Sequence, residues 1–122
     1  MKQQYRLFYG GTEIGHIIQE DADFPNVFGT FRPLDESQEN ATRDRIQRYI
    51  DYSIAVDQLM QEGKEVEWDR FCSENEPQFL DLVETDDWHL LDEGSVEPIL
   101  IPNFCQDSGI VWRWNVSSEN KN

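Results

Sequence analysis

The sequence predicts an α+β domain in which a mainly antiparallel sheet packs against one long helix and one or two short helices. Three observations support this fold class: apolar residues alternate on both sides of Gly10-Gly11, the middle of the chain has helical periodicity, and three more alternating stretches follow it. Strands that precede and follow a helical middle favour a sheet covered by helices. We expect residues 1–116 to form a single domain and residues 117–122 a frayed tail.

The first element is a predicted hairpin. A Gly10-Gly11 pair between alternating stretches suits a two-residue turn with positive φ angles. The simplest register then pairs Leu7 with Ile14 and Tyr5 with His16. In that register His16 lies on the inward face. A loop and a third strand, residues 21–25 and 26–32, are expected to follow.

A long helix is predicted over residues 35–62. Asp35 or Ser37 can cap its start, and Gly63 can end it. Its apolar residues share one broad arc of the helix, which comprises Ile46, Tyr49, Ile50, Ile54, Val56 and Met60. Asp57 lies within this arc, one turn after Ser53, so its carboxylate needs a partner if the arc is buried.

The rest of the chain predicts two short helices and three strands. The helices contain Trp68, Phe71 and Cys72 and, after Pro77, Phe79, Leu80 and Val83. The strands are expected over residues 88–92, 96–101 and 109–115. We expect a core that includes Leu7, Ile14, Ile46, Ile50, Phe79, Leu80, Ile99, Ile101 and Trp112. On the last strand, Ile110, Trp112 and Trp114 share one face, which suits a core better than a recognition platform.

Charge is the most unusual property of the sequence. The chain has 25 acidic and 10 basic residues, and residues 62–97 hold 13 of the acids with only Lys64 and Arg70. Such a balance disfavours direct binding to nucleic acid or to an anionic membrane, because both need cationic groups. There is no long apolar run for a signal peptide or a membrane span, so we expect a cytoplasmic location.

No motif for catalysis or for a cofactor is present. Asp21-Ala22-Asp23 with Asn26 resembles the start of a calcium loop but lacks its central glycine and closing glutamate. Cys72 and Cys105 are far apart and lack a metal-binding or redox spacing. We therefore expect no metal and no cofactor.

Two functional hypotheses follow. The first is a non-enzymatic protein that binds a basic protein partner, by the electrostatics that inhibitors, immunity proteins and nucleic-acid mimics use. Its candidate binding residues are Glu65, Glu67, Asp69, Glu74, Glu76, Asp86 and Asp87. The second is a small enzyme or ligand-binding domain with a cleft around Asp57 and His16, with Tyr5 beside them. Plain solubility would also explain the charge.

Overall fold

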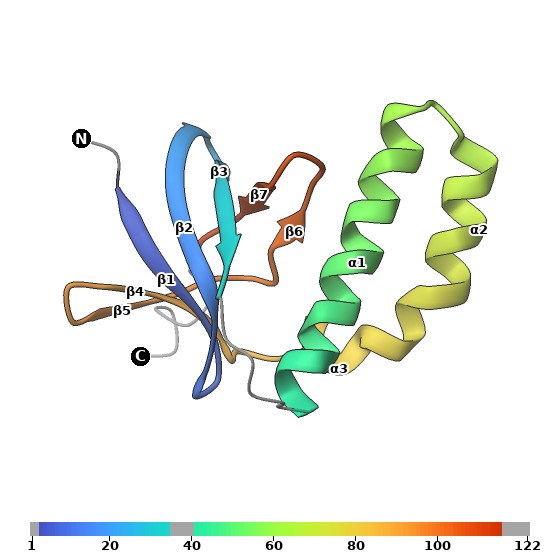
Figure 1. Ribbon diagram of the computed structural model, residues 1–122. Helices are drawn as coiled ribbons and strands as arrows, with labels where there is room; N and C mark the ends of the chain where they lie inside the picture. The colour runs from blue at the N-terminus through green and yellow to red at the C-terminus, as the bar shows by residue number, and fades with distance from the viewer. Residues whose placement is uncertain (1–2, 35–40, 116–122) are drawn as a thin grey trace.

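The computed structural model describes residues 3–34 and 41–115 and has an α+β fold, as predicted (Figure 1). The strands are β1 Gln4–Tyr9, β2 Thr12–Asp23, β3 Asn26–Pro33, β4 Trp88–Asp92, β5 Ser95–Pro98, β6 Asn103–Phe104 and β7 Gly109–Trp112. The helices are α1 Ala41–Gln61, α2 Glu65–Asn75, the 3-10 helix η1 Glu76–Phe79 and the single turn α3 Leu80–Val83. The expected start of the long helix at residues 35–40 and the expected tail lie outside the described residues.

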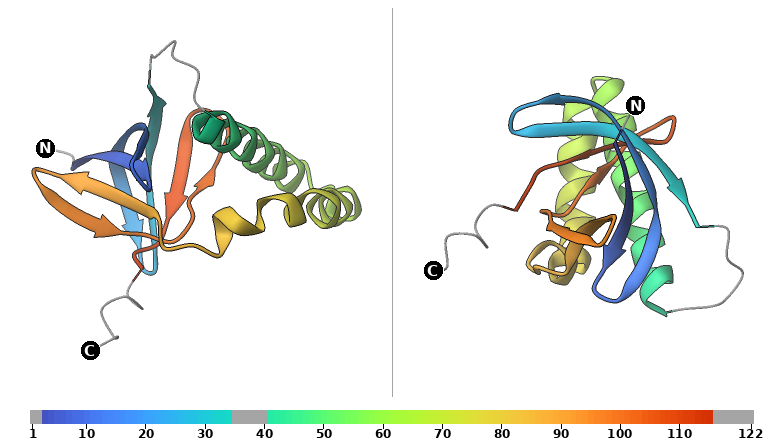
Figure 2. Two further views of the ribbon diagram at one scale, coloured as in Figure 1. Left: turned by 90° about the horizontal axis from the view of Figure 1, so that it is seen from below. Right: turned by 90° about the vertical axis from the view of Figure 1, so that its left-hand side faces the viewer.

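All strands belong to one antiparallel sheet with the order β5-β4-β1-β2-β3-β7-β6. The segment that follows β5 lies beside the segment that follows β7. Leu100 N donates a hydrogen bond to Arg113 O (3.0 Å), and Asn115 N donates one to Pro98 O (3.0 Å). Ile99 and Trp114 form the bridge between these two segments. The sheet therefore curves round on itself, and the helical hairpin of α1 and α2 lies to one side of it (Figure 2).

The first hairpin turns at Gly10-Gly11 as predicted, but its predicted register is wrong. Leu7 pairs with Gly15 and Tyr5 pairs with Ile17, because Ile14 is an extra residue in a β-bulge. The bulge turns both Ile14 and Ile17 inward and leaves His16 on the other face. A β-carbon on Gly15 would lie 2.4 Å from Arg32 O. The close approach of β3 at this point therefore requires glycine.

The predicted loop over residues 21–25 is shorter than expected. β2 continues to Asp23 and pairs with β3 down to Asn26, so only Phe24 and Pro25 form the turn. The side chain of Phe24 is 96% exposed at this turn.

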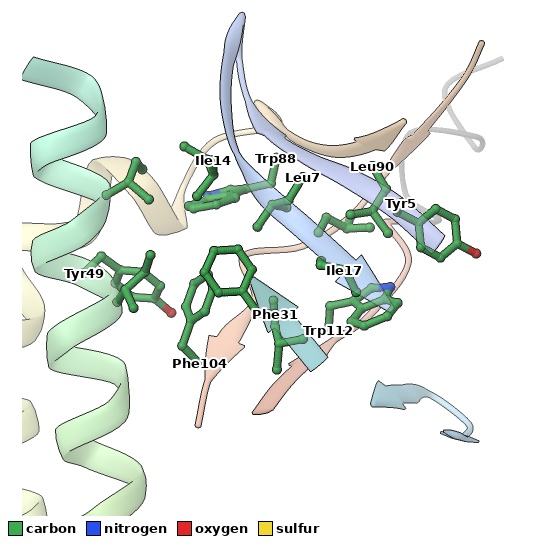
Figure 3. Close-up of a cluster of buried hydrophobic side chains, with 14 of the residues drawn as sticks. Tyr5, Leu7, Ile14, Ile17, Phe31, Tyr49, Trp88, Leu90, Phe104 and Trp112 are labelled. Atoms are coloured by element: carbon green, nitrogen blue, oxygen red, sulfur yellow. The ribbon is translucent and has the colours of Figure 1, made fainter. Parts of the chain in front are cut away.

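The core fills the space between the curved sheet and α1 (Figure 3). Of the predicted core residues, seven are buried: Leu7, Ile14, Ile46, Ile50, Phe79, Ile99 and Trp112. Ile101 is half-buried against the core. The prediction for Leu80 is wrong, because its side chain is 44% exposed and Leu82 is buried instead. The tighter 3-10 turn of η1 changes the helical phase, and Leu82 O then accepts a hydrogen bond from Trp88 Nε1 (2.9 Å).

A stripe of polar side chains on α1 covers the free edge of β6. Every fourth residue along this stripe of α1 bonds to the backbone of every second residue along the segment that contains β6. The pairs are Tyr49 with Pro102, Ser53 with Phe104 and Asp57 with Gln106. Four helical residues rise about 6 Å and two strand residues about 6.6 Å, so the two spacings nearly match. The helix thus takes the place of a further strand and satisfies an edge that would otherwise lack partners.

Candidate functional site

The seven acidic residues proposed for partner binding are all exposed. We call them the acidic surface: Glu65, Glu67, Asp69 and Glu74 of α2, Glu76 of η1, and Asp86 and Asp87 between α3 and β4. The whole of residues 62–97 lies in the described part of the chain, and its acids are all exposed except Asp92, which is half-buried. These carboxylates therefore keep most of their hydration and cost little to maintain in the folded chain.

Helix α2 carries four of these acids on two flanks. Its face toward α1 holds Trp68, Phe71 and Cys72, and no residue of α2 is buried. Glu65 and Asp69 are four residues apart and share one flank. Glu67 and Glu74 are seven residues apart and share the other. The acids of α2 therefore border its apolar face on both sides.

Basic side chains neutralise only part of this charge. Lys64 Nζ lies 3.1 Å from Glu62 Oε1 and 3.9 Å from Glu67 Oε2, and the contact with Lys64 lowers the pKa of Glu62. Arg45 of α1 forms an ion pair with Asp81 of α3. Among the described residues, Glu65, Asp69, Glu74 and Glu76 form no ion pair. Of the two flanks of α2, only the one with Glu67 and Glu74 therefore has an ion pair, and the carboxylates of Glu65 and Asp69 have none with the described residues.

Asp86 and Asp87 also have a local structural role. Thr85 Oγ1 donates to Asp87 Oδ2 (2.8 Å), and Gly10 N donates to Asp87 O (2.8 Å). Asn115 Nδ2 donates to Asp86 Oδ1 (3.2 Å). These bonds hold the segment before β4 against the sheet, whereas α2 begins at the far tip of the helical hairpin (Figure 1). The structure therefore does not bring these two residues beside Glu65.

The residues of the alternative cleft do not converge. Tyr5 and His16 line one pocket of about 400 Å³, together with Arg6 and Asp92. Burial, followed by the charges of Asp92 and Glu97, raises the pKa of Tyr5. Asp57 does not line this pocket, because it lies on α1 and its Oδ2 accepts a hydrogen bond from Gln106 N (3.1 Å). The unusual carboxylate in the apolar arc thus has a structural partner.

The aromatic face of the last strand belongs to the core. Ile110 and Trp112 are each 1% exposed, and Trp114 is half-buried. Tyr5 packs edge-on against both tryptophans, with ring centroids 6.3 and 6.0 Å away. This face is therefore not a recognition platform.

The pattern of the sequence did not indicate one further feature, a pocket of about 340 Å³ between α1, α2 and η1. Its lining includes Tyr52, Trp68, Cys72, Glu76 and Phe79. We call it the interhelical pocket. The spacing of the apolar residues in α2 predicts a helix with one buried face. This spacing does not indicate whether the contact with α1 leaves a pocket. Burial and the adjacent Cys72 raise the pKa of Tyr52, so its phenol is neutral at ordinary pH.

We also searched for a metal site, for a membrane-spanning helix and for similar known proteins. The described residues contain no group of three or more His, Cys, Asp or Glu side chains that could hold a metal ion. In the same part of the chain, no helix has the length and apolar character needed to cross a membrane. The chain matches no protein-family model, and it has no significant match among curated proteins or solved structures.

Proposed function

We propose that this protein binds a basic protein partner through its acidic surface, with Glu65 and Asp69 of α2 at the centre of the contact. The observation that carries the proposal is that these exposed carboxylates share one flank of a helix and form no ion pair with any described residue. A net formal charge of −15 adds a long-range attraction for a cationic protein.

The position of the flank supports an intermolecular role. α2 contacts the remainder of the fold chiefly through α1, and its outward flanks take no part in the core. Glu65 and Asp69 repel each other at a spacing of four residues, which slightly destabilises the helix. A cationic partner that lies between the two carboxylates would remove this repulsion and would gain from both charges.

Capture from the source cell tests the proposal. The chain is immobilised and bound proteins are eluted with a rising salt gradient, because exposed charge contacts weaken as salt screens them. We expect a basic protein to elute with salt. The double variant Glu65→Lys/Asp69→Lys should capture much less of it.

A matched control separates a local contact from net charge. Asp21→Lys/Asp23→Lys makes the same change in charge at exposed positions of β2, far from α2 in the sequence. We expect this control to retain most of the capture. Equal loss in both variants, or a captured protein that salt does not release, would contradict a binding surface on α2.

A further inference from the structure

The interhelical pocket contains an unusual combination of side chains. Tyr52 of α1, Trp68 of α2 and Phe79 of η1 all line it. The ring of Tyr52 stacks on Phe71 at 5.4 Å and lies 5.1 Å from that of Phe79. Trp68 is half-buried and makes no ring contact with any other described aromatic residue, and its Nε1 is buried without a hydrogen-bond partner among the described residues.

The pocket also has a single charge. Glu76 is the only charged residue among the described residues that line it, and it is exposed. No basic group balances this carboxylate within the lining. An anion would be repelled by Glu76 and by the net negative charge of the chain, whereas a cation would be attracted by both.

Aromatic rings beside a carboxylate favour one class of ligand. The face of an aromatic ring attracts a cation, most strongly for tryptophan, and sets of such rings bind quaternary ammonium groups. A volume of about 340 Å³ suits a small molecule or one side chain. From the lining, its charge and its size, we infer that the interhelical pocket binds the ammonium group of an organic cation among its aromatic rings, Trp68 included, and that the charge of Glu76 attracts this group.

This inference does not depend on the proposed function. The basic protein is assigned to Glu65 and Asp69, which do not line the interhelical pocket. Trp68 also lines a second pocket with these two acids, whereas Glu76 lines the interhelical pocket and not the second one, so the effect of Glu76→Gln assigns cation binding to the interhelical pocket. Binding of a small cation and capture of a protein are measured separately, so either can fail without the other.

The test is a titration of the full chain with choline chloride, followed by the indole N–H signals in ¹H–¹⁵N NMR spectra. The signal of Trp68 is assigned from its absence in Trp68→Leu. An uncharged molecule of the same shape, 3,3-dimethylbutan-1-ol, and sodium chloride at the same ionic strength are the controls. We expect a saturable shift of the Trp68 signal with choline and at least about tenfold weaker binding of the alcohol, because the alcohol lacks the charge that the ring face and Glu76 attract.

Variants locate the contact. Trp68→Leu should weaken choline binding by about tenfold or more, monitored by other shifted signals, and Trp68→Phe should weaken it less because a ring remains. Glu76→Gln should weaken it by a few-fold, whereas Glu84→Gln, an exposed acid outside the lining, should have no effect. A peptide with one trimethyl-lysine is titrated in parallel. Tighter binding of choline identifies a free small molecule as the source of the ammonium group, and tighter binding of the peptide identifies a protein side chain.

Three results would overturn the inference. They are equal binding of choline and the uncharged alcohol, the absence of any saturable shift with choline and with the peptide, and choline binding that Trp68→Leu and Glu76→Gln leave unchanged in variants that are folded.

Discussion

Replacement of Ser53 by alanine should destabilise the fold far more than the loss of one hydroxyl suggests. The Ser53 hydroxyl donates to Phe104 O (3.0 Å) and accepts from Phe104 N (2.7 Å). Ser53 is 6% exposed and Phe104 is 2% exposed, so water does not reach these groups. The variant therefore leaves both backbone groups of Phe104 without a partner at the edge of the sheet.

The magnitude follows from the two unsatisfied groups. Each buried backbone group that loses its partner costs about 1–3 kcal/mol, so Ser53→Ala should lower the free energy of unfolding by about 2–6 kcal/mol. The measurement is urea denaturation followed by tryptophan fluorescence. Gln58→Ala is the control, because Gln58 is exposed on the same helix, and its effect should stay within about 0.5 kcal/mol. A loss below about 0.5 kcal/mol for Ser53→Ala would refute the role of α1 as cover for the β6 edge.

Three further stability predictions follow from the described contacts. Leu82→Ala should cost about 2–5 kcal/mol, whereas Leu80→Ala should cost well under half of that, because Leu82 is 1% and Leu80 44% exposed; similar losses by urea denaturation would contradict the helical phase after η1. Gly15→Ala should cost more than about 2 kcal/mol because its β-carbon would meet Arg32 O, and Gly11→Ala, which has no atom within 4 Å of the added carbon, should be nearly neutral. Burial raises the pKa of Tyr49 to about 12, from 10. As pH rises, the Tyr49 phenol therefore loses its proton in the unfolded chain before it does so in the folded chain. Its contribution to the free energy of unfolding is complete below pH 10 and is lost between pH 10 and about 12, by at most about 2.7 kcal/mol. Unfolding free energies across that range should fall more steeply in the parent chain than in Tyr49→Phe, and equal slopes would show that Tyr49 is not responsible.

Local signals in the sequence predicted most elements of the fold. A glycine pair predicted the turn at Gly10-Gly11, and the spacing of apolar residues predicted the strand Trp88–Asp92 and the long helix. Both signals depend only on residues that are close together in the sequence. The bulge at Ile14 could not be predicted in this way, because it depends on how β2 fits against β3 and the core. The two-residue strand β6 is too short to show a period.

The candidate site shows the same division. The exposure of the acidic residues followed from their charge alone. The partner of Asp57 did not, because Gln106 lies 49 residues further along the chain. The interhelical pocket was also beyond local patterns, since Tyr52, Trp68 and Glu76 meet only after two helices and a 3-10 turn have packed together.

The most direct test of the proposed function is the rate at which the chain associates with its captured basic partner. Stopped-flow association is measured from about 50 to about 500 mM salt for the parent chain, for Glu65→Lys/Asp69→Lys and for Asp21→Lys/Asp23→Lys. We predict that the rate constant of the parent falls steeply with salt. The reversal on α2 should lower it about tenfold at low salt, with little difference at high salt and little change in the dissociation rate. A rate that does not depend on salt, or an equal loss in the two double variants, would contradict binding through Glu65 and Asp69.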